Sequence, residues 1–156
     1  TELANRRFIF EKVRRVLKRK ASPKTHHTLM LIDVDNLKSI NDEYGHQTGD
    51  KVLKIVADIG RNVLRDGDCF ARIGGDEFAV LLTHGACSSE AELVATRMLE
   101  VIGLPIVVAG YEVSVSASIG IACYPDNGLD LEALLQQADD AMYTVKRNGK
   151  NAFTFA

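Results

Sequence analysis

The sequence predicts an α/β (α+β layered) fold, in which helices flank a central mixed sheet. The apolar pattern gives the element order βααββα, then a β-hairpin, then a last helix, which is typical of a layered sheet-and-helix domain. A length of 156 residues suits one hydrophobic core. With 46% hydrophobic and 26% charged residues, the composition is that of a folded globular chain. We therefore expect residues 1–156 to form one domain.

The first element is predicted to be an amphipathic helix over residues 3 to 20. Phe10, Val13 and Leu17 recur at helical spacing, and the outer face is basic although the whole chain has a net charge of −2. We interpret residues 1–20 as a lead-in helix from an upstream region. The alternative is a nucleic-acid or membrane surface, but the balanced net charge gives no general case for a nucleic-acid partner.

The remaining elements follow from apolar periodicity and from glycine positions. Gly45 is expected to end a short helix, and the Gly74-Gly75 pair favours a two-residue hairpin turn with positive φ. A second hairpin is predicted around Gly110. The expected strands are 29–34, 69–73, 77–82 and 152–156, and the expected helices are 36–45, 50–64, 88–102 and 130–150.

The cysteines and the apolar runs indicate the type of protein. Cys69, Cys87 and Cys123 are odd in number and widely spaced, so we predict reduced thiols in a cytoplasmic domain and no disulfide framework. The apolar runs are shorter than the ~18 residues that span a bilayer. We therefore expect no direct membrane insertion by this chain, and leave any membrane anchor to other parts of a longer protein.

Carboxylates beside apolar strands are the first sign of chemistry. Asp76 and Glu77 follow the glycine pair, and Asp33 ends the first predicted strand. Asp33 and Asp76 could converge on a hard divalent cation, whose preferred ligands are oxygens. Such an ion would polarise phosphoryl oxygens. The alternatives are a solvated hairpin for the acid pair and, for Asp35, a role as N-cap of the next helix, which we favour.

The full string "ARIGGDEFAVLL", residues 71–82, resembles the defining motif of the GGDEF domain family, the diguanylate cyclases. Further segments resemble other family blocks in the same order, namely "LIDVDNLKSINDEYGHQTGD", "SASIGIACYP", "ADDAMY" and "KRNGKN". The resemblance implies a nucleotidyl-cyclase, polymerase-palm-like fold. It also implies an antiparallel homodimer that joins two GTP molecules into cyclic di-GMP and releases two pyrophosphates.

The resemblance assigns roles to individual positions. It implies Mg²⁺ (or Mn²⁺) on Asp33, Asp76 and the Val34 carbonyl, with Glu77 as a metal-associated or charge-positioning group; Asp33, Asp76 and Glu77 are the catalytic candidates. The implied GTP-binding residues are Asn36, Leu37, Lys38, Gly74, Gly75, Lys146 and Lys150 for phosphates, and Asn41 and Asp50 for guanine. A carboxylate accepts from guanine N1–H and the exocyclic amine, and adenine offers no matching donors.

An R-x-x-D pattern, Arg65 to Asp68, precedes the glycine pair at the spacing of the family's product-inhibitory site. Arg97 aligns with a secondary arginine of that site. Guanidinium groups suit guanine edges and phosphates, so we expect cyclic di-GMP to bind here as an inhibitor.

Other functions remain to be weighed against the cyclase. One alternative is a catalytically silent module that binds GTP or cyclic di-GMP and regulates an attached domain. Another is a cyclase of different base choice, which Asn41 and Asp50 argue against. The resemblance extends to GGDEF halves of proteins with an EAL phosphodiesterase domain, so we expect additional sensory or EAL domains in the full-length protein.

Overall fold

The structure, a computed structural model, describes residues 4–19, 25–83 and 87–156. The two ends of the first predicted helix, residues 3 and 20, lie outside these ranges. The elements in chain order are β1 (Ala4–Asn5), α1 (Arg6–Lys18), β2 (His27–Asp35), α2 (Leu37–Tyr44), α3 (His46–Val63), β3 (Cys69–Arg72), β4 (Glu77–Thr83), α4 (Cys87–Ile102), β5 (Ile106–Val108), β6 (Tyr111–Val113), β7 (Ser116–Tyr124), α5 (Leu131–Arg147) and β8 (Ala152–Phe155).

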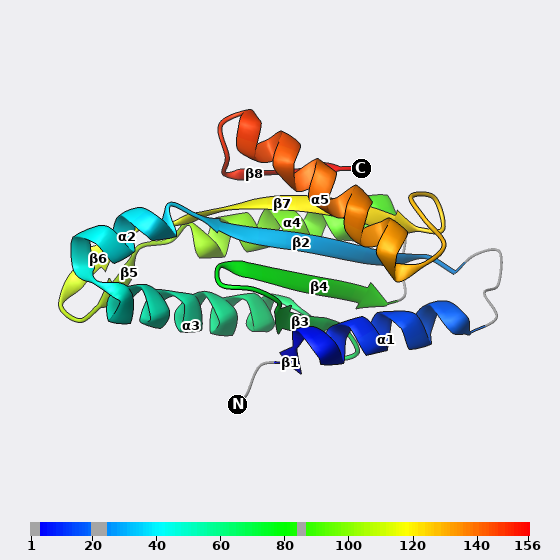
Figure 1. Ribbon diagram of the computed structural model, residues 1–156, viewed down its shortest axis with the longest axis horizontal. Helices are drawn as coiled ribbons and strands as arrows, with labels where there is room; N and C mark the ends of the chain where they lie inside the picture. Colours follow the sequence, from blue (N-terminus) through cyan, green and yellow to red (C-terminus); the bar gives the residue numbers. More distant parts are fainter. Residues whose placement is uncertain (1–3, 20–24, 84–86) are drawn as a thin grey trace.

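A six-stranded mixed sheet runs through the middle of the molecule (Figure 1), in the order β1-β3-β4-β2-β7-β8. The pairs β3–β4, β4–β2 and β2–β7 are antiparallel, whereas β1–β3 and β7–β8 are parallel. Strand β2 is central and buried along its whole length. Burial on both faces explains its almost continuous apolar sequence. The predicted mixed sheet with flanking helices is confirmed.

Each face of the sheet has its own apolar core. Met30 and Ile32 of β2 pack on the face covered by α2, α3 and α4, whereas Leu29 and Leu31 pack with α1 and α5. This alternation follows from the two-residue period of a strand. Helix α1 is amphipathic, as predicted, and buries Ile9 in the second core. Within the described ranges no helix is both long and apolar enough to span a membrane.

The second predicted hairpin is also present. Strands β5 and β6 form a separate two-stranded sheet, joined by Ala109 and Gly110 with φ of 51° and 82°. Two positive φ values in succession are what a tight hairpin turn requires. Tyr111 is the first residue of β6, and the centroid of its ring lies 4.7 Å from the centroid of the Tyr44 ring. The hairpin therefore supports the C-terminal end of α2 (Figure 1).

Some boundaries differ from the sequence prediction. Helix α3 begins at His46 rather than residue 50, so Gly49 lies inside it. The polar residues of its first turn hide the helical period. Strand β1 was not predicted, because two residues carry no detectable alternation. Ser114 and Val115 separate β6 from β7, which belong to different sheets.

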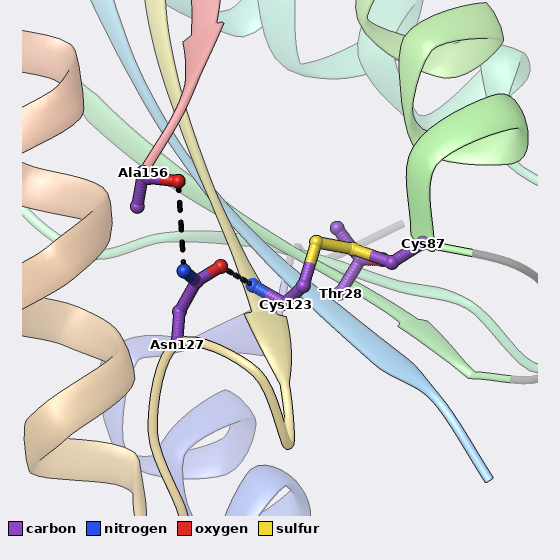
Figure 2. The surroundings of a disulfide bond; sticks show 5 residues. All are labelled: Thr28, Cys87, Cys123, Asn127 and Ala156. Carbon is purple, nitrogen blue, oxygen red and sulfur yellow. Dashed lines mark hydrogen bonds between the residues drawn. A yellow bond between two sulfur atoms is a disulfide. The ribbon is translucent and has the colours of Figure 1, made fainter. Parts of the chain in front are cut away.

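The prediction that all cysteines are reduced is wrong for one pair. Cys87, the first residue of α4, forms a disulfide with Cys123 of β7, with 5.8 Å between their Cα atoms (Figure 2). Residues that the sequence spaces widely meet here because α4 packs across the sheet. Thr28 of β2 donates a hydrogen bond to the Cys87 sulfur at 3.3 Å. Cys69 is buried and free.

Candidate active site

The candidate site lies where β2 ends beside the β3–β4 connection. Antiparallel pairing places Asp33 of β2 directly opposite Glu77 of β4. The Val34 amide also donates to the Asp76 carbonyl oxygen at 3.0 Å, which ties the strand end to the loop. Sheet register thus brings together carboxylates that lie more than forty positions apart in the sequence.

The glycine loop differs from the predicted turn. Residues 73–76 separate the two strands, so the connection is longer than two residues, and neither Gly74 nor Gly75 has a positive φ. The loop is closed by the Ile73 amide donating to the Glu77 carbonyl at 2.9 Å and by Arg72 Nε donating to the Gly75 carbonyl at 3.0 Å. A Cβ at Gly75 would meet no atom within 4 Å. The outer side of this loop is therefore open to a ligand.

Asp33 has an unusual electrostatic environment. Its side chain is 10% exposed and accepts a hydrogen bond from Lys146 Nζ through Oδ2. Oδ1 is buried and has no hydrogen-bond partner. Burial, together with the negative charges of Asp76 and Glu77, raises the pKa of Asp33 to about 6, although Lys146 opposes the shift. The site therefore holds more negative charge than Lys146 balances.

Lys146 lies in the last turn of α5, which packs over β7. Burial favours the neutral amine, but the hydrogen bond to Asp33 and the negative charges of Glu77 and Asp76 outweigh it and raise the pKa of Lys146. The ammonium is therefore retained at neutral pH. Lys150 follows in the connection to β8 and lies 3.4 Å from Asn36 Oδ1.

The preferred N-cap role for Asp35 is wrong. The residue is buried, and its carboxylate accepts hydrogen bonds from Ser116 Oγ at 2.7 Å, Ser118 Oγ at 2.8 Å and the Asn151 amide at 3.2 Å. Asn36 instead occupies the N-cap position of α2, in the left-handed region with φ of 64°. Asp35 is a structural link among β2, β7 and the start of β8.

A cavity of about 320 Å³ collects most of the predicted metal and phosphate residues. It combines carboxylates, ammonium groups and the N-terminus of α2, which is a suitable environment for anionic oxygens. Its lining is Asp33, Val34, Asp35, Asn36, Leu37, Lys38, Ser39, Asp76, Lys146 and Lys150. Glu77 does not line it; its carboxylate lies near Gly74. Across the described part of the chain, no three acidic, histidine or cysteine side chains are arranged to hold one metal ion.

The predicted guanine pair lies at the corner between α2 and α3. Asn41 is on α2, and Asp50 is exposed on α3, with the chain reversing at Gly45. Asn41 Oδ1 is buried without a hydrogen-bond partner and contacts the backbone of Gly49. The adjacent helices thus bring Asn41 next to the residue that precedes Asp50.

Of the residues predicted for the product site, Arg65 and Asp68 lie together and Arg97 lies apart from them. Arg65 Nε lies 3.8 Å from Asp68, whose side chain is 3% exposed, and burial raises the pKa of that carboxyl. The terminal guanidinium nitrogen lies 2.9 Å from Glu90 of α4. Arg97 lines a neighbouring cavity rather than the one beside Arg65, although Val63 borders both. Sequence reasoning missed Glu90, because a carboxylate in the first turn of a helix is ordinary.

Comparison with protein families assigns the chain to a family. The family model described as "Diguanylate cyclase, GGDEF domain" matches residues 1–152. The chain belongs to the GGDEF domain family of diguanylate cyclases. Its fold is accordingly that of a cyclase domain.

Two curated relatives and one crystal structure illustrate the similarity. The chain is 40% identical to diguanylate cyclase TpbB of Pseudomonas aeruginosa, over 97% of this chain and 35% of that protein. It is 36% identical to the bifunctional diguanylate cyclase/cyclic di-GMP phosphodiesterase MucR of P. aeruginosa, over 99% of this chain and 22% of that protein. The crystal structure of the TpbB GGDEF domain matches with a TM-score of 0.95 and 39% identity, covering 99% of this chain and 97% of that one. The chain thus spans between about a fifth and a third of these curated relatives' lengths.

Proposed function

We propose that the chain is a diguanylate cyclase domain that condenses two GTP molecules into cyclic di-GMP and two pyrophosphates. The observation that carries the proposal is the cavity in which Asp33 and Asp76 meet Lys146 and Lys150. Carboxylates beside ammonium groups suit a nucleoside triphosphate with its divalent cation. Membership of the GGDEF family supports the same reaction.

The donor set fits Mg²⁺ or Mn²⁺. Asp33 Oδ1 is a buried acceptor without a partner, and the charges of Asp76 and Glu77 repel that of Asp33. Asp33, Asp76 and the Val34 carbonyl would hold the ion, with Glu77 as a charge-positioning neighbour. When bound, the ion supplies charge neutralisation and polarisation at the phosphoryl oxygens.

The surrounding residues bind the triphosphate. The amides of Asn36 and Leu37 lie at the start of α2, where backbone N–H groups lack helical partners. Lys38 and Lys150 add positive charge at the same cavity, as does Lys146. At Gly75, where a Cβ would meet no atom within 4 Å, the loop leaves room for the phosphates.

Base recognition is assigned to Asn41 and Asp50. A carboxylate at Asp50 accepts from guanine N1–H and the 2-amine, and the Asn41 amide both donates and accepts. Adenine lacks those donors, so it would leave the carboxylate unpaired. The proposal therefore includes selectivity for GTP over ATP.

The reaction requires two copies of the chain. Each ribose 3′-hydroxyl attacks the α-phosphate of the other GTP, so two new P–O bonds form, two pyrophosphates leave and two protons are released. A site that holds one GTP cannot present both ends of this exchange. We therefore infer an antiparallel homodimer, in which each protomer contributes half of the catalytic centre.

Product feedback completes the proposed activity. Arg65 and Asp68 offer a guanidinium and a carboxylate beside a cavity of about 210 Å³. These groups suit the phosphates and guanine edges of cyclic di-GMP. Arg97 of α4 adds positive charge at the neighbouring cavity. We also infer a cytoplasmic domain, where GTP is available, attached to sensory or EAL domains in a longer protein.

The test is to incubate the purified protein, freed of bound product, with GTP and Mg²⁺ and to separate the products by liquid chromatography. Cyclic di-GMP is expected from the unaltered protein and from Asp58→Ala, which removes an exposed carboxylate on α3. Asp76→Ala should abolish it. GTP binding without product, persisting after fusion to a dimerising domain, would contradict the cyclase and indicate a silent binding module.

A further inference from the structure

We propose that Gly49 is a positioning residue for nucleotide recognition, because only a residue without a side chain lets Asn41 adopt the conformation in which it meets the base. This inference rests on the proposed function, in which Asn41 contacts guanine. It adds a residue that touches no nucleotide and acts only through Asn41.

The steric evidence is direct. A Cβ atom built at Gly49 would lie 1.7 Å from Asn41 Oδ1 and 2.8 Å from Asn41 Cγ. Non-bonded heavy atoms do not approach so closely. Rotating the amide by half a turn exchanges its oxygen and nitrogen and leaves the clash unchanged. Every residue other than glycine at position 49 therefore excludes the observed conformation of Asn41.

The conformation of Asn41 is itself unusual. Its Oδ1 is buried against α3 without a hydrogen-bond partner, which costs free energy in a folded protein. Asn41 Nδ2 lies farther from the same Cβ position, at 3.4 Å. The contact with Gly49 thus fixes the orientation of the Asn41 side-chain amide at the α2–α3 corner. An Asn41 amide that is held beside Asp50 at a cost in folding free energy is expected where a ligand binds to the amide in that orientation.

Glycine at position 49 also lowers the stability of α3, and the backbone conformation there does not require it. Gly49 lies inside α3, where its amide donates to the Gly45 carbonyl at 3.2 Å and its φ is not positive. Alanine is a better residue than glycine in a helix interior. The clashing atoms belong to the end of a side chain, so in Gly49→Ala the Asn41 amide can rotate away. The substitution should therefore leave folding intact and damage binding.

The test is a double-variant cycle on nucleotide affinity. A GTP analogue without the ribose 3′-hydroxyl, which cannot be cyclised, is titrated with Mg²⁺ into four proteins by calorimetry: unaltered, Gly49→Ala, Asn41→Ala and the double variant. Losing one hydrogen-bonding group predicts about tenfold weaker binding for each single variant. The double variant should bind within about twofold of Asn41→Ala, because position 49 acts only through Asn41.

Gly60→Ala is the matched control on the same helix. Its Cβ would lie 2.7 Å from the Phe70 ring in the core, so its thermal midpoint should fall while the folded protein keeps its affinity. Gly49→Ala should show the reverse, with an unchanged or higher midpoint and weaker binding. A general packing role for Gly49 would not produce that reversal.

Two results overturn the inference in distinguishable ways. If Asn41→Ala binds the analogue normally, the guanine assignment in the proposed function fails, and the role of Gly49 fails with it. If Asn41→Ala weakens binding but Gly49→Ala does not, or if the two losses add in the double variant, only the role of Gly49 is wrong.

Discussion

Lys146 of α5 donates a hydrogen bond to the Asp33 carboxylate of β2, across 113 positions of sequence. This contact joins the last helix to the central strand at the candidate site. Lys146 forms an ion pair with Asp33, and the negative charges of Asp33, Glu77 and Asp76 favour its ammonium form. The residue therefore links charge balance in the site with the phosphates that we expect the cavity to bind.

Lys146→Met should weaken GTP binding by about tenfold, because it removes a charge-assisted contact from the phosphate cavity. The neighbouring substitution Arg147→Met is the control, since Arg147 is exposed and stacks on Tyr143 instead. Affinity for a non-cyclisable GTP analogue, measured by calorimetry at fixed Mg²⁺, checks the prediction. Equal affinities for both variants would contradict it.

Divalent metal should stabilise the folded chain. The carboxylates of Asp33 and Asp76 are ready ligands in the folded state only, so Mg²⁺ at ten times its Kd should add about 1.4 kcal/mol, or roughly 3 to 6 °C in Tm. Thermal unfolding is compared in MgCl₂ and in NaCl of equal ionic strength. Asp76→Asn should lose most of the difference. A shift that persists in this variant would place the ion elsewhere.

Substitution of Asp35 should destabilise the fold, whereas substitution of Asp76 should leave its stability almost unchanged. Asp35→Ala removes three hydrogen bonds and leaves the fully buried Ser118 hydroxyl without its acceptor. We expect a loss of about 3 kcal/mol in the free energy of unfolding. Asp76→Ala should change that free energy by less than about 0.5 kcal/mol, because it removes a repelling charge from an open loop. Urea denaturation of both variants without metal measures these changes in the free energy of unfolding.

The two aspartates at the end of β2 show where sequence reasoning succeeds and where it stops. The order of elements and the burial of β2 follow from apolar periodicity, which reports one chain segment at a time. Asp33 and Asp35 look alike on that basis. Their different roles come from partners on β7, β8 and α5, which no local pattern announces. Resemblance to the family assigned Asp33 to the metal site, which stays a prediction although Asp33 lines the cavity, and it carried no information on Asp35.

Two further predictions were wrong, namely a two-residue turn at Gly74-Gly75 and the reduced state of all three cysteines. A glycine pair permits positive φ but does not require it, and here Arg72 holds the loop carbonyls in another geometry. Widely spaced cysteines indicate no pairing until the packing of α4 on the sheet is known. A local contact of Arg72 decided the first outcome, and long-range packing decided the second.

The Cys87–Cys123 disulfide should contribute to stability. It closes a loop with a sequence separation of 36, for which loss of chain entropy in the unfolded state gives about 2 to 4 kcal/mol. Dithiothreitol, which supplies two electrons and converts the bond to two thiols, should lower the urea midpoint by a corresponding amount. Cys123→Ala should be less stable and insensitive to the reductant. Cys69→Ala, which changes the free cysteine, should keep the response.

Arg65 and Glu90 should affect product binding in opposite directions. Glu90 lies 2.9 Å from the Arg65 guanidinium, so it competes with an anionic ligand for that group. Arg65→Ala should weaken cyclic di-GMP binding at least tenfold, because it removes the charge that faces the phosphates. Glu90→Gln should strengthen binding by a few-fold, since it frees the same guanidinium from a carboxylate. Calorimetric titration of cyclic di-GMP into each variant measures both effects. Glu92→Gln, which changes an exposed carboxylate two residues farther along α4, is the control. Unchanged affinity in Arg65→Ala would remove this residue from the product site, and weaker binding in Glu90→Gln would show that the carboxylate positions the arginine rather than competing for it.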